Sequence, residues 1–201
     1  MTDTVTNDPE PTDAETPIAD EPFSPPLTAS EIGYHGAVWD IRKDTVDYNG
    51  KDMVREYIAH TGAVAVYAED DEGRVLVIQQ YRHPVRLRDW ELPAGLLDQE
   101  GEDPLDAARR ELGEEADLEA DDWSELIRFH PSPGGSDEEI IVYRARGVRA
   151  TSDAFDRTDE EADIVKRWVP RDQVVAGVLE GRLSNAILSL SALAVERLES
   201  R

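Results

Sequence analysis

Two short apolar runs separated by a polar turn constrain the fold of this chain more than any other feature. Residues 62–67 read Gly-Ala-Val-Ala-Val-Tyr, residues 75–81 read Val-Leu-Val-Ile-Gln-Gln-Tyr, and residues 70–73 between them are polar. A continuous apolar run of this length, bounded by turn residues, is typical of a buried strand. The pair therefore predicts a hairpin that contains a buried strand.

Weaker signals of the same kinds extend along the chain. Asn49-Gly50 is a strong hairpin signal, and it joins two expected strands at 34–48 and 53–60. Residues 104–116 are expected to form a helix, because Pro104 is tolerated in a first turn and apolar residues then recur along one side. Further strands are expected at 123–130, 139–148 and 163–169, an extended piece at 90–93, and helices at 171–179 and 185–198. This irregular order of strands and helices predicts an α+β sandwich.

Acidic residues dominate the chain, with 45 Asp and Glu against 21 Lys and Arg and a net charge of −24. This field repels nucleic-acid phosphates and anionic membrane surfaces, so neither is an expected partner. Residues 1–30 combine seven acids and six prolines with no basic residue, which predicts a disordered tail. We expect N-terminal antiparallel strands over 31–60 to follow it, and then a main domain over 61–201.

The composition also bears on the environment. The chain has no cysteine, which excludes disulfides, thiolate metal sites and a cysteine nucleophile and favours a cytoplasmic location. It has no apolar run of the roughly 18 residues that a membrane helix needs. Three lysines stand against 18 arginines, and with the high acidity this favours a surface adapted to molar salt over that of an ordinary acidic protein.

Three carboxylates crowd one side of the expected helix at 104–116. At about 100° per residue, Glu111, Glu114 and Glu115 share one arc beside the apolar stripe. Like charges one turn apart destabilise a helix, although Arg110 can reach Glu114, and hard divalent cations bind oxygen ligands of this type. A solvated acidic face is the alternative. Pro93-Ala94-Gly95 precedes the helix and can aim the Ala94 carbonyl toward the same ion, and Glu102 can pair with Arg110 or cap the helix.

Residues 95–118 resemble the signature box of the Nudix hydrolases, a Gly and a Glu followed by Arg-Glu-apolar-x-Glu-Glu-x-Gly-apolar. Eight of its nine fixed positions are present: Gly95, Glu102, Arg110, Glu111, Leu112, Glu114, Glu115 and Leu118. The gap between Gly and Glu is one residue longer than usual, and Asp117 stands where the second Gly is expected. Asp enters a left-handed helix cap more readily than most residues, so Asp117 can replace that Gly.

The flanking segments resemble the ADP-ribose pyrophosphatase branch of this family. They are residues 80–84, residues 90–95 and the loop at 132–138, in which Pro133 lies about sixteen residues past the box. The resemblance implies an α/β/α sandwich with a mixed sheet, and a small N-terminal β-sheet used in forming a homodimer. It also implies Mg²⁺-dependent hydrolysis of ADP-ribose to AMP and ribose 5-phosphate. The alternatives are another nucleoside diphosphate sugar or dinucleotide as substrate, or a nucleotide-sensing module without catalysis.

The resemblance assigns roles to individual residues. It places Mg²⁺, with Mn²⁺ as the alternative, on the Ala94 carbonyl, Glu111 and Glu115. Glu138, in a loop expected to be mobile, orients or deprotonates water or joins the metal shell, with Glu114 and Arg110 in support. Substrate contacts are expected from Arg82, Leu96, Glu111 and Pro133. The four histidines show no ligand spacing, so each is expected to be a packed or surface imidazole, and His130 lies nearest the loop.

Overall fold

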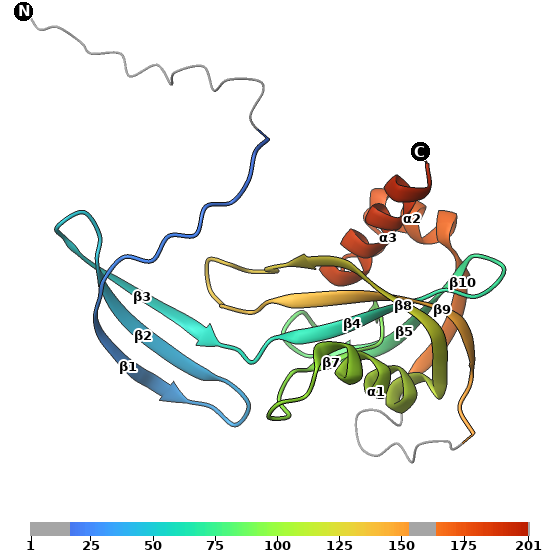
Figure 1. Ribbon diagram of the computed structural model, residues 1–201, viewed down its shortest axis with the longest axis horizontal. Coiled ribbons are helices and arrows are strands. Elements are labelled where there is room, and N and C mark those ends of the chain that lie inside the picture. The colour runs from blue at the N-terminus through green and yellow to red at the C-terminus, as the bar shows by residue number, and fades with distance from the viewer. Residues whose placement is uncertain (1–16, 153–163, 201) are drawn as a thin grey trace, which may run out of the picture.

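A mixed four-stranded sheet forms the centre of the main domain in the computed structural model, which describes residues 17–152 and 164–200 (Figure 1). Its strand order is β7-β4-β9-β8, and β4 (Ala63–Ala68) runs parallel to β9 (Ile140–Ala150). The outer strands β7 (Ala94–Leu96) and β8 (Leu118–Phe129) are antiparallel to their neighbours. A second sheet has the order β10-β5-β6, formed by β10 (Val165–Pro170), β5 (Arg74–Arg82) and β6 (Leu87–Glu91).

Helices cover both faces of the central sheet, as the α/β/α sandwich requires (Figure 1). Val64 and Val66 of β4 pack in one core cluster with Leu112 of α1 (Pro104–Ala116). Ala65 and Tyr67 point to the other side and pack with residues of α2 (Arg171–Leu179) and α3 (Ala186–Glu199). Because successive strand residues face opposite sides, all six residues of β4 are buried.

The two apolar runs that predict a hairpin do form consecutive strands, but the hairpin is wrong. β4 and β5 lie in different sheets and are linked by a bridge between Glu69 and Val75 next to the turn. The turn at 70–73 is tight, with Asp70 accepting backbone hydrogen bonds from Glu72 and Arg74. Beyond it β4 pairs with β9, which follows more than seventy residues later, so a long-range pairing replaces the local one.

A separate three-stranded antiparallel sheet precedes the main domain (Figure 1). It consists of β1 (Leu27–His35), β2 (Asp40–Asp47) and β3 (Asp52–Ala59). The hairpin at Asn49-Gly50 is present, with φ of 56° and 76° at these residues. Two boundaries of this sheet differ from expectation, and in the main domain the strand expected over 123–130 begins earlier, at Leu118. The strand expected over 34–48 is divided by a turn at 36–39, and β1 begins at Leu27, inside the segment expected to be tail. Most of that expected tail, residues 1–16, lies outside the described residues.

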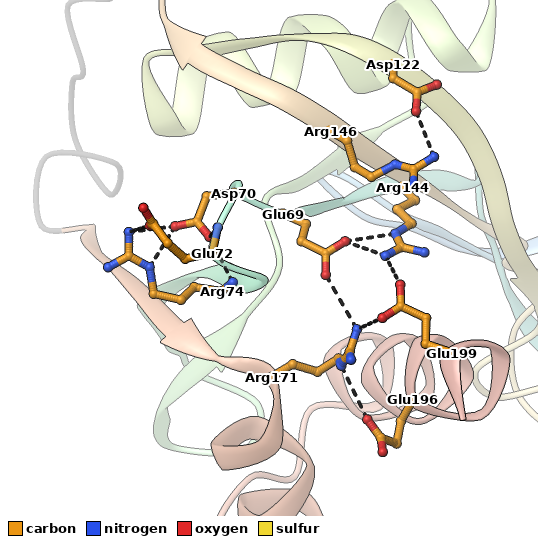
Figure 2. Close-up of polar contacts among 10 residues, drawn as sticks. All are labelled: Glu69, Asp70, Glu72, Arg74, Asp122, Arg144, Arg146, Arg171, Glu196 and Glu199. Atoms are coloured by element: carbon orange, nitrogen blue, oxygen red, sulfur yellow. Dashed lines mark hydrogen bonds and ion pairs between the residues drawn. The ribbon is translucent and has the colours of Figure 1, made fainter. Parts of the chain in front are cut away.

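An ion-pair network ties the C-terminal helix to the central sheet. Figure 2 shows Glu69, which follows β4, between Arg144 of β9 and Arg171 of α2, with Glu199 of α3 bonded to both arginines. Glu69 is 6% exposed, and a buried carboxylate needs a paired positive charge. The guanidinium groups of Arg144 and Arg171 supply it. The network joins β9, α2 and α3 to the residue that follows β4.

Candidate active site

The β7–α1 segment places the residues of the box. Asp103, and not Glu102, caps α1 by accepting a hydrogen bond from Leu105 N at 2.9 Å. At the other end Asp117 adopts φ 59° and ψ 38°, which confirms that it takes the left-handed position of the missing Gly. The helix therefore begins and ends at fixed residues, and this sets which of its side chains face β7.

Two carboxylates of α1 lie against the backbone of β7. Glu115 is 6% exposed, and its Oε2 accepts a hydrogen bond from Ala94 N at 2.8 Å. One turn earlier, the Glu111 carboxylate lies over Gly95, where an added Cβ would be 2.0 Å from its Cδ and Oε1. Any side chain at position 95 would therefore displace Glu111. This explains physically why the box needs Gly here.

Arg110 compensates the crowded negative charge beside these two residues. Its guanidinium bonds Glu102 at 3.0 and 3.1 Å, Glu111 at 2.6 Å and Glu114 at 2.8 Å. The hydrogen bonds that Arg110 donates to Glu102, together with the charge of Glu111, raise the pKa of Arg110 above its usual value. The expected reach of Arg110 to Glu114 is confirmed, and of the two roles left open for Glu102 the structure shows the ion pair.

The donor set at this place fits a hard divalent cation. Glu111 and Glu115 supply carboxylate oxygens from consecutive turns, and they lie against adjacent residues of β7, Glu111 over Gly95 and Glu115 on the Ala94 amide. Across residues 17–152 and 164–200, no three His, Asp or Glu side chains converge as a metal site. The two α1 carboxylates are therefore the oxygen donors that the described residues bring together here.

Arg82 is held by a buried carboxylate. Its Nε and Nη2 bond the two carboxylate oxygens of Glu91 at 2.8 and 2.7 Å, a bidentate pair. Glu91 is 3% exposed, whereas the Arg82 side chain is 46% exposed, so one end of the pair is fixed in the core and the other faces solvent. The hydrogen bonds to Glu91 raise the pKa of Arg82, and Glu115 adds to the same effect through its charge. Arg82 is thus a fixed cation on the side of the site that holds Glu115.

The loop at 132–138 is fastened to the end of β3. Ile58 N donates to Gly135 O at 2.9 Å, and His60 N donates to Asp137 Oδ1 at 2.7 Å. The Glu138 carboxylate faces His60, with its Oε1 3.5 Å from Nε2 of the ring. Glu139 instead pairs with Arg128 at 2.9 Å, so the two neighbouring glutamates point to different surroundings.

Leu96 and Pro133 are the remaining residues that the sequence predicts to contact substrate. Leu96 lies in β7 opposite Ala63 and packs against the core, and Pro133 is exposed in the loop. His130 donates from Nδ1 to the Glu138 carbonyl at 2.8 Å, so it supports the loop backbone. His60 is the polar residue that the sequence did not single out. It is 77 residues from Asp137, and no local spacing links the two.

A family model described as NUDIX domain matches residues 59–188. The chain belongs to the Nudix family. The match begins at the last residue of β3 and includes the box, Arg82, His60 and the 132–138 loop. The expected fold class and family are confirmed.

Known proteins resemble this Nudix chain over most of its length. An ADP-ribose pyrophosphatase of Mycobacterium tuberculosis is 42% identical over 168 residues, which is 83% of this chain and 81% of that protein. A methanol dehydrogenase activator of Bacillus methanolicus is 34% identical, covering 88% of this chain and 94% of its own. A crystal structure of an ADP compounds hydrolase shares the fold with a TM-score of 0.73 and 19% identity, covering 90% of this chain and 96% of that one. No helix in the described part of the chain has the length and hydropathy needed to cross a membrane.

Proposed function

We propose that this Nudix protein hydrolyses the diphosphate of ADP-ribose to AMP and ribose 5-phosphate. The observation that carries the proposal is the pair of α1 carboxylates, Glu111 and Glu115, held against the Ala94-Gly95 backbone. The 42% identity to a protein named ADP-ribose pyrophosphatase supports the choice of substrate. A diphosphate anion would be repelled by this acidic chain unless cations bridge it to the carboxylates.

Glu111, Glu115 and the Ala94 carbonyl would hold Mg²⁺, with Mn²⁺ as the alternative ion. When bound, the cation supplies charge neutralisation, polarisation of the phosphorus and a lowered pKa of water. The residues of the chain do the positioning, which is most of the catalysis in phosphoryl transfer. Arg110 holds Glu111 and Glu114 in place through its hydrogen bonds.

Glu138 is the proposed base, taking a proton from the attacking water as a phosphorus–oxygen bond of the diphosphate breaks. Arg82 would contact the substrate phosphates while its other side stays bonded to Glu91. Leu96 and Pro133 are the proposed backbone and loop contacts of the substrate. Leu96 is on β7, opposite Ala63 at the start of β4, and the 132–138 loop leads into β9, the strand on the other side of β4.

We also propose that the chain acts as a homodimer. The N-terminal sheet and its neighbouring segments leave large apolar side chains exposed, which are Phe23, Leu27, Tyr34, Val38 and Val54. Apolar surface of this kind is typical of an interaction site. Light scattering at several concentrations tests the dimer, and refolding in molar KCl against dilute buffer tests the proposed adaptation to salt. The cytoplasmic location stays a prediction.

Product analysis with ADP-ribose, with and without Mg²⁺, tests the function. We expect AMP and ribose 5-phosphate in equal amounts, dependent on the metal and abolished by a chelator. An inactive Glu111→Gln variant that remains folded controls for contaminating hydrolases. Metal-dependent cleavage of another nucleoside diphosphate sugar without cleavage of ADP-ribose would replace the substrate but keep the reaction. Binding without cleavage of any diphosphate would show a sensing module instead.

A further inference from the structure

We propose that His60 is a positioning residue for Glu138, a role that rests on Glu138 being the base of the proposed function. The basis is a juxtaposition at the end of β3, where the buried ring of His60 lies between a backbone amide, an indole and the Glu138 carboxylate. Its side chain is 7% exposed. Both ring nitrogens of this buried imidazole face polar groups, so polar contacts as well as packing set the orientation of the ring.

The tautomer of His60 follows from its backbone neighbour. Gly62 N lies 2.9 Å from His60 Nδ1, and because an amide N–H can only donate, Nδ1 is the acceptor. In the neutral ring the proton is then on Nε2. That nitrogen faces Glu138 Oε1 at 3.5 Å, longer than the usual hydrogen-bond distance of about 2.7–3.2 Å, so the proposed role requires the glutamate side chain to rotate toward the ring.

The ring plane is fixed independently of that contact. Trp39, in the turn between β1 and β2, stacks on His60 with ring centroids 4.1 Å apart and an interplanar angle of 21°. The backbone N of His60 donates to Asp137, the residue before Glu138. The imidazole therefore cannot swing away from the carboxylate without breaking the stack and losing the hydrogen bond from Gly62 N.

The other end of the contact is equally fixed. Glu138 N donates to Ser136 Oγ at 3.1 Å, and the Glu138 carbonyl accepts from His130. The backbone on both sides of the glutamate is thus bonded, which leaves its side-chain torsions as the remaining freedom. An Nε2–H donor aimed at the carboxylate selects one of those orientations, as donors behind reactive carboxylates and imidazoles do elsewhere.

Two amide substitutions separate this role from a purely structural one. His60→Asn keeps an oxygen near the position of Nδ1 for Gly62 but has no group that reaches Glu138. His60→Gln reaches the position of Nε2 and offers an amide donor to Glu138, but it does not keep the Nδ1 acceptor. A structural role predicts that Asn preserves activity better than Gln does, and a positioning role predicts the reverse.

Steady-state kinetics with ADP-ribose and saturating Mg²⁺ provide the first test. We expect His60→Asn to lower kcat by about tenfold or more with KM changed less than about twofold, and His60→Gln to recover most of the loss. In a Glu138→Gln background, His60→Asn should add less than about twofold, since contacting residues that act together are not additive. Equal losses from Asn and Gln, or full additivity with Glu138→Gln, would overturn the proposal.

A second measurement does not depend on turnover, so it separates failure of this inference from failure of the proposed function. Side-chain ¹⁵N NMR of the wild-type protein should show His60 with the proton on Nε2, and Glu138→Gln should shift that Nε2–H resonance. A proton on Nδ1, or a resonance that Glu138→Gln leaves unchanged, refutes the contact. If the wild type instead cleaves no ADP-ribose while both NMR results hold, the substrate is wrong and the positioning of Glu138 stands.

Discussion

Replacing Gly95 by Ala is the sharpest perturbation of the proposed metal site. The added Cβ would lie 2.0 Å from Cδ and Oε1 of Glu111, whereas ordinary contacts begin at 3.4 Å, so the carboxylate must retreat by 3.4 − 2.0 = 1.4 Å. A displacement of about 1 Å of a positioned group lowers rates by about 10²-fold. We expect kcat/KM to fall at least that far, equivalent to about 2.7 kcal/mol, and more Mg²⁺ to be needed for half-maximal rate.

Stability should respond much less than activity. The atoms that collide are the far end of a flexible side chain, which can rotate away, and Gly95 has no positive φ that Ala would strain. Replacing Gly also reduces the entropy of the unfolded chain, so the free energy of unfolding should stay within about 1 kcal/mol of wild type. Gly33→Ala is the matched control, because its Cβ would lie 3.6 Å from the nearest atom. A Gly95→Ala enzyme within threefold of the wild-type rate would refute the assignment of Glu111.

Three further perturbations follow from the same geometry. Glu115→Gln should lower metal-dependent turnover by more than about 10²-fold. The circular dichroism spectrum should stay unchanged, because Gln keeps an oxygen that accepts the hydrogen bond from Ala94 N; substantial remaining activity would contradict the ligand role. Arg82→Ala should raise KM and also destabilise the fold by about 2 kcal/mol, because buried Glu91 loses its partner while the arginine itself is half exposed; chemical denaturation measures this. The hydrogen bond from Arg144 lowers the pKa of Glu199, so this carboxylate stabilises the fold above its ordinary pKa of 4.5 and the contribution is lost as pH falls below that value. Glu199→Gln should therefore lower Tm at pH 7 and have a smaller effect in acid; an equal effect at both pH values would contradict the ion-pair explanation.

Local patterns in the sequence predicted the parts of the structure that local forces determine. Asn49-Gly50 formed its hairpin, the helix at 104–116 has the expected bounds, and Asp117 adopts the left-handed cap, because each depends on residues within one turn. The hairpin of β4 with β5 failed because pairing with β9 determines where β4 lies, and no local pattern contains that partner.

The same distinction between local and long-range contacts applies to the candidate site. Glu111, Glu115 and Arg110 lie on one helix, so their shared side was readable from helical periodicity, and the collision at Gly95 explains a residue that the box only names. His60 could not be found, because its partner Glu138 is far along the chain and their contact depends on the docking of a loop. Arg82 was singled out, yet its bond to Glu91 needed the register between β5 and β6.

The contacts of α1 with β7 join residues close in sequence, whereas the contacts of the 132–138 loop with the end of β3 join distant ones. This difference in sequence separation bears on the order of folding. The contacts of α1 with β7 arise within residues 94–116, whereas the bonds that Ile58 N and His60 N donate to the 132–138 loop each close 77 residues of chain. The entropic penalty for closing a loop rises with its length, so we expect the short contacts to form before the long ones. Partly folded chains should therefore form the proposed cation site before the arrangement around Glu138, and on the proposed roles such a chain would have no hydrolytic activity until β9 joins β4.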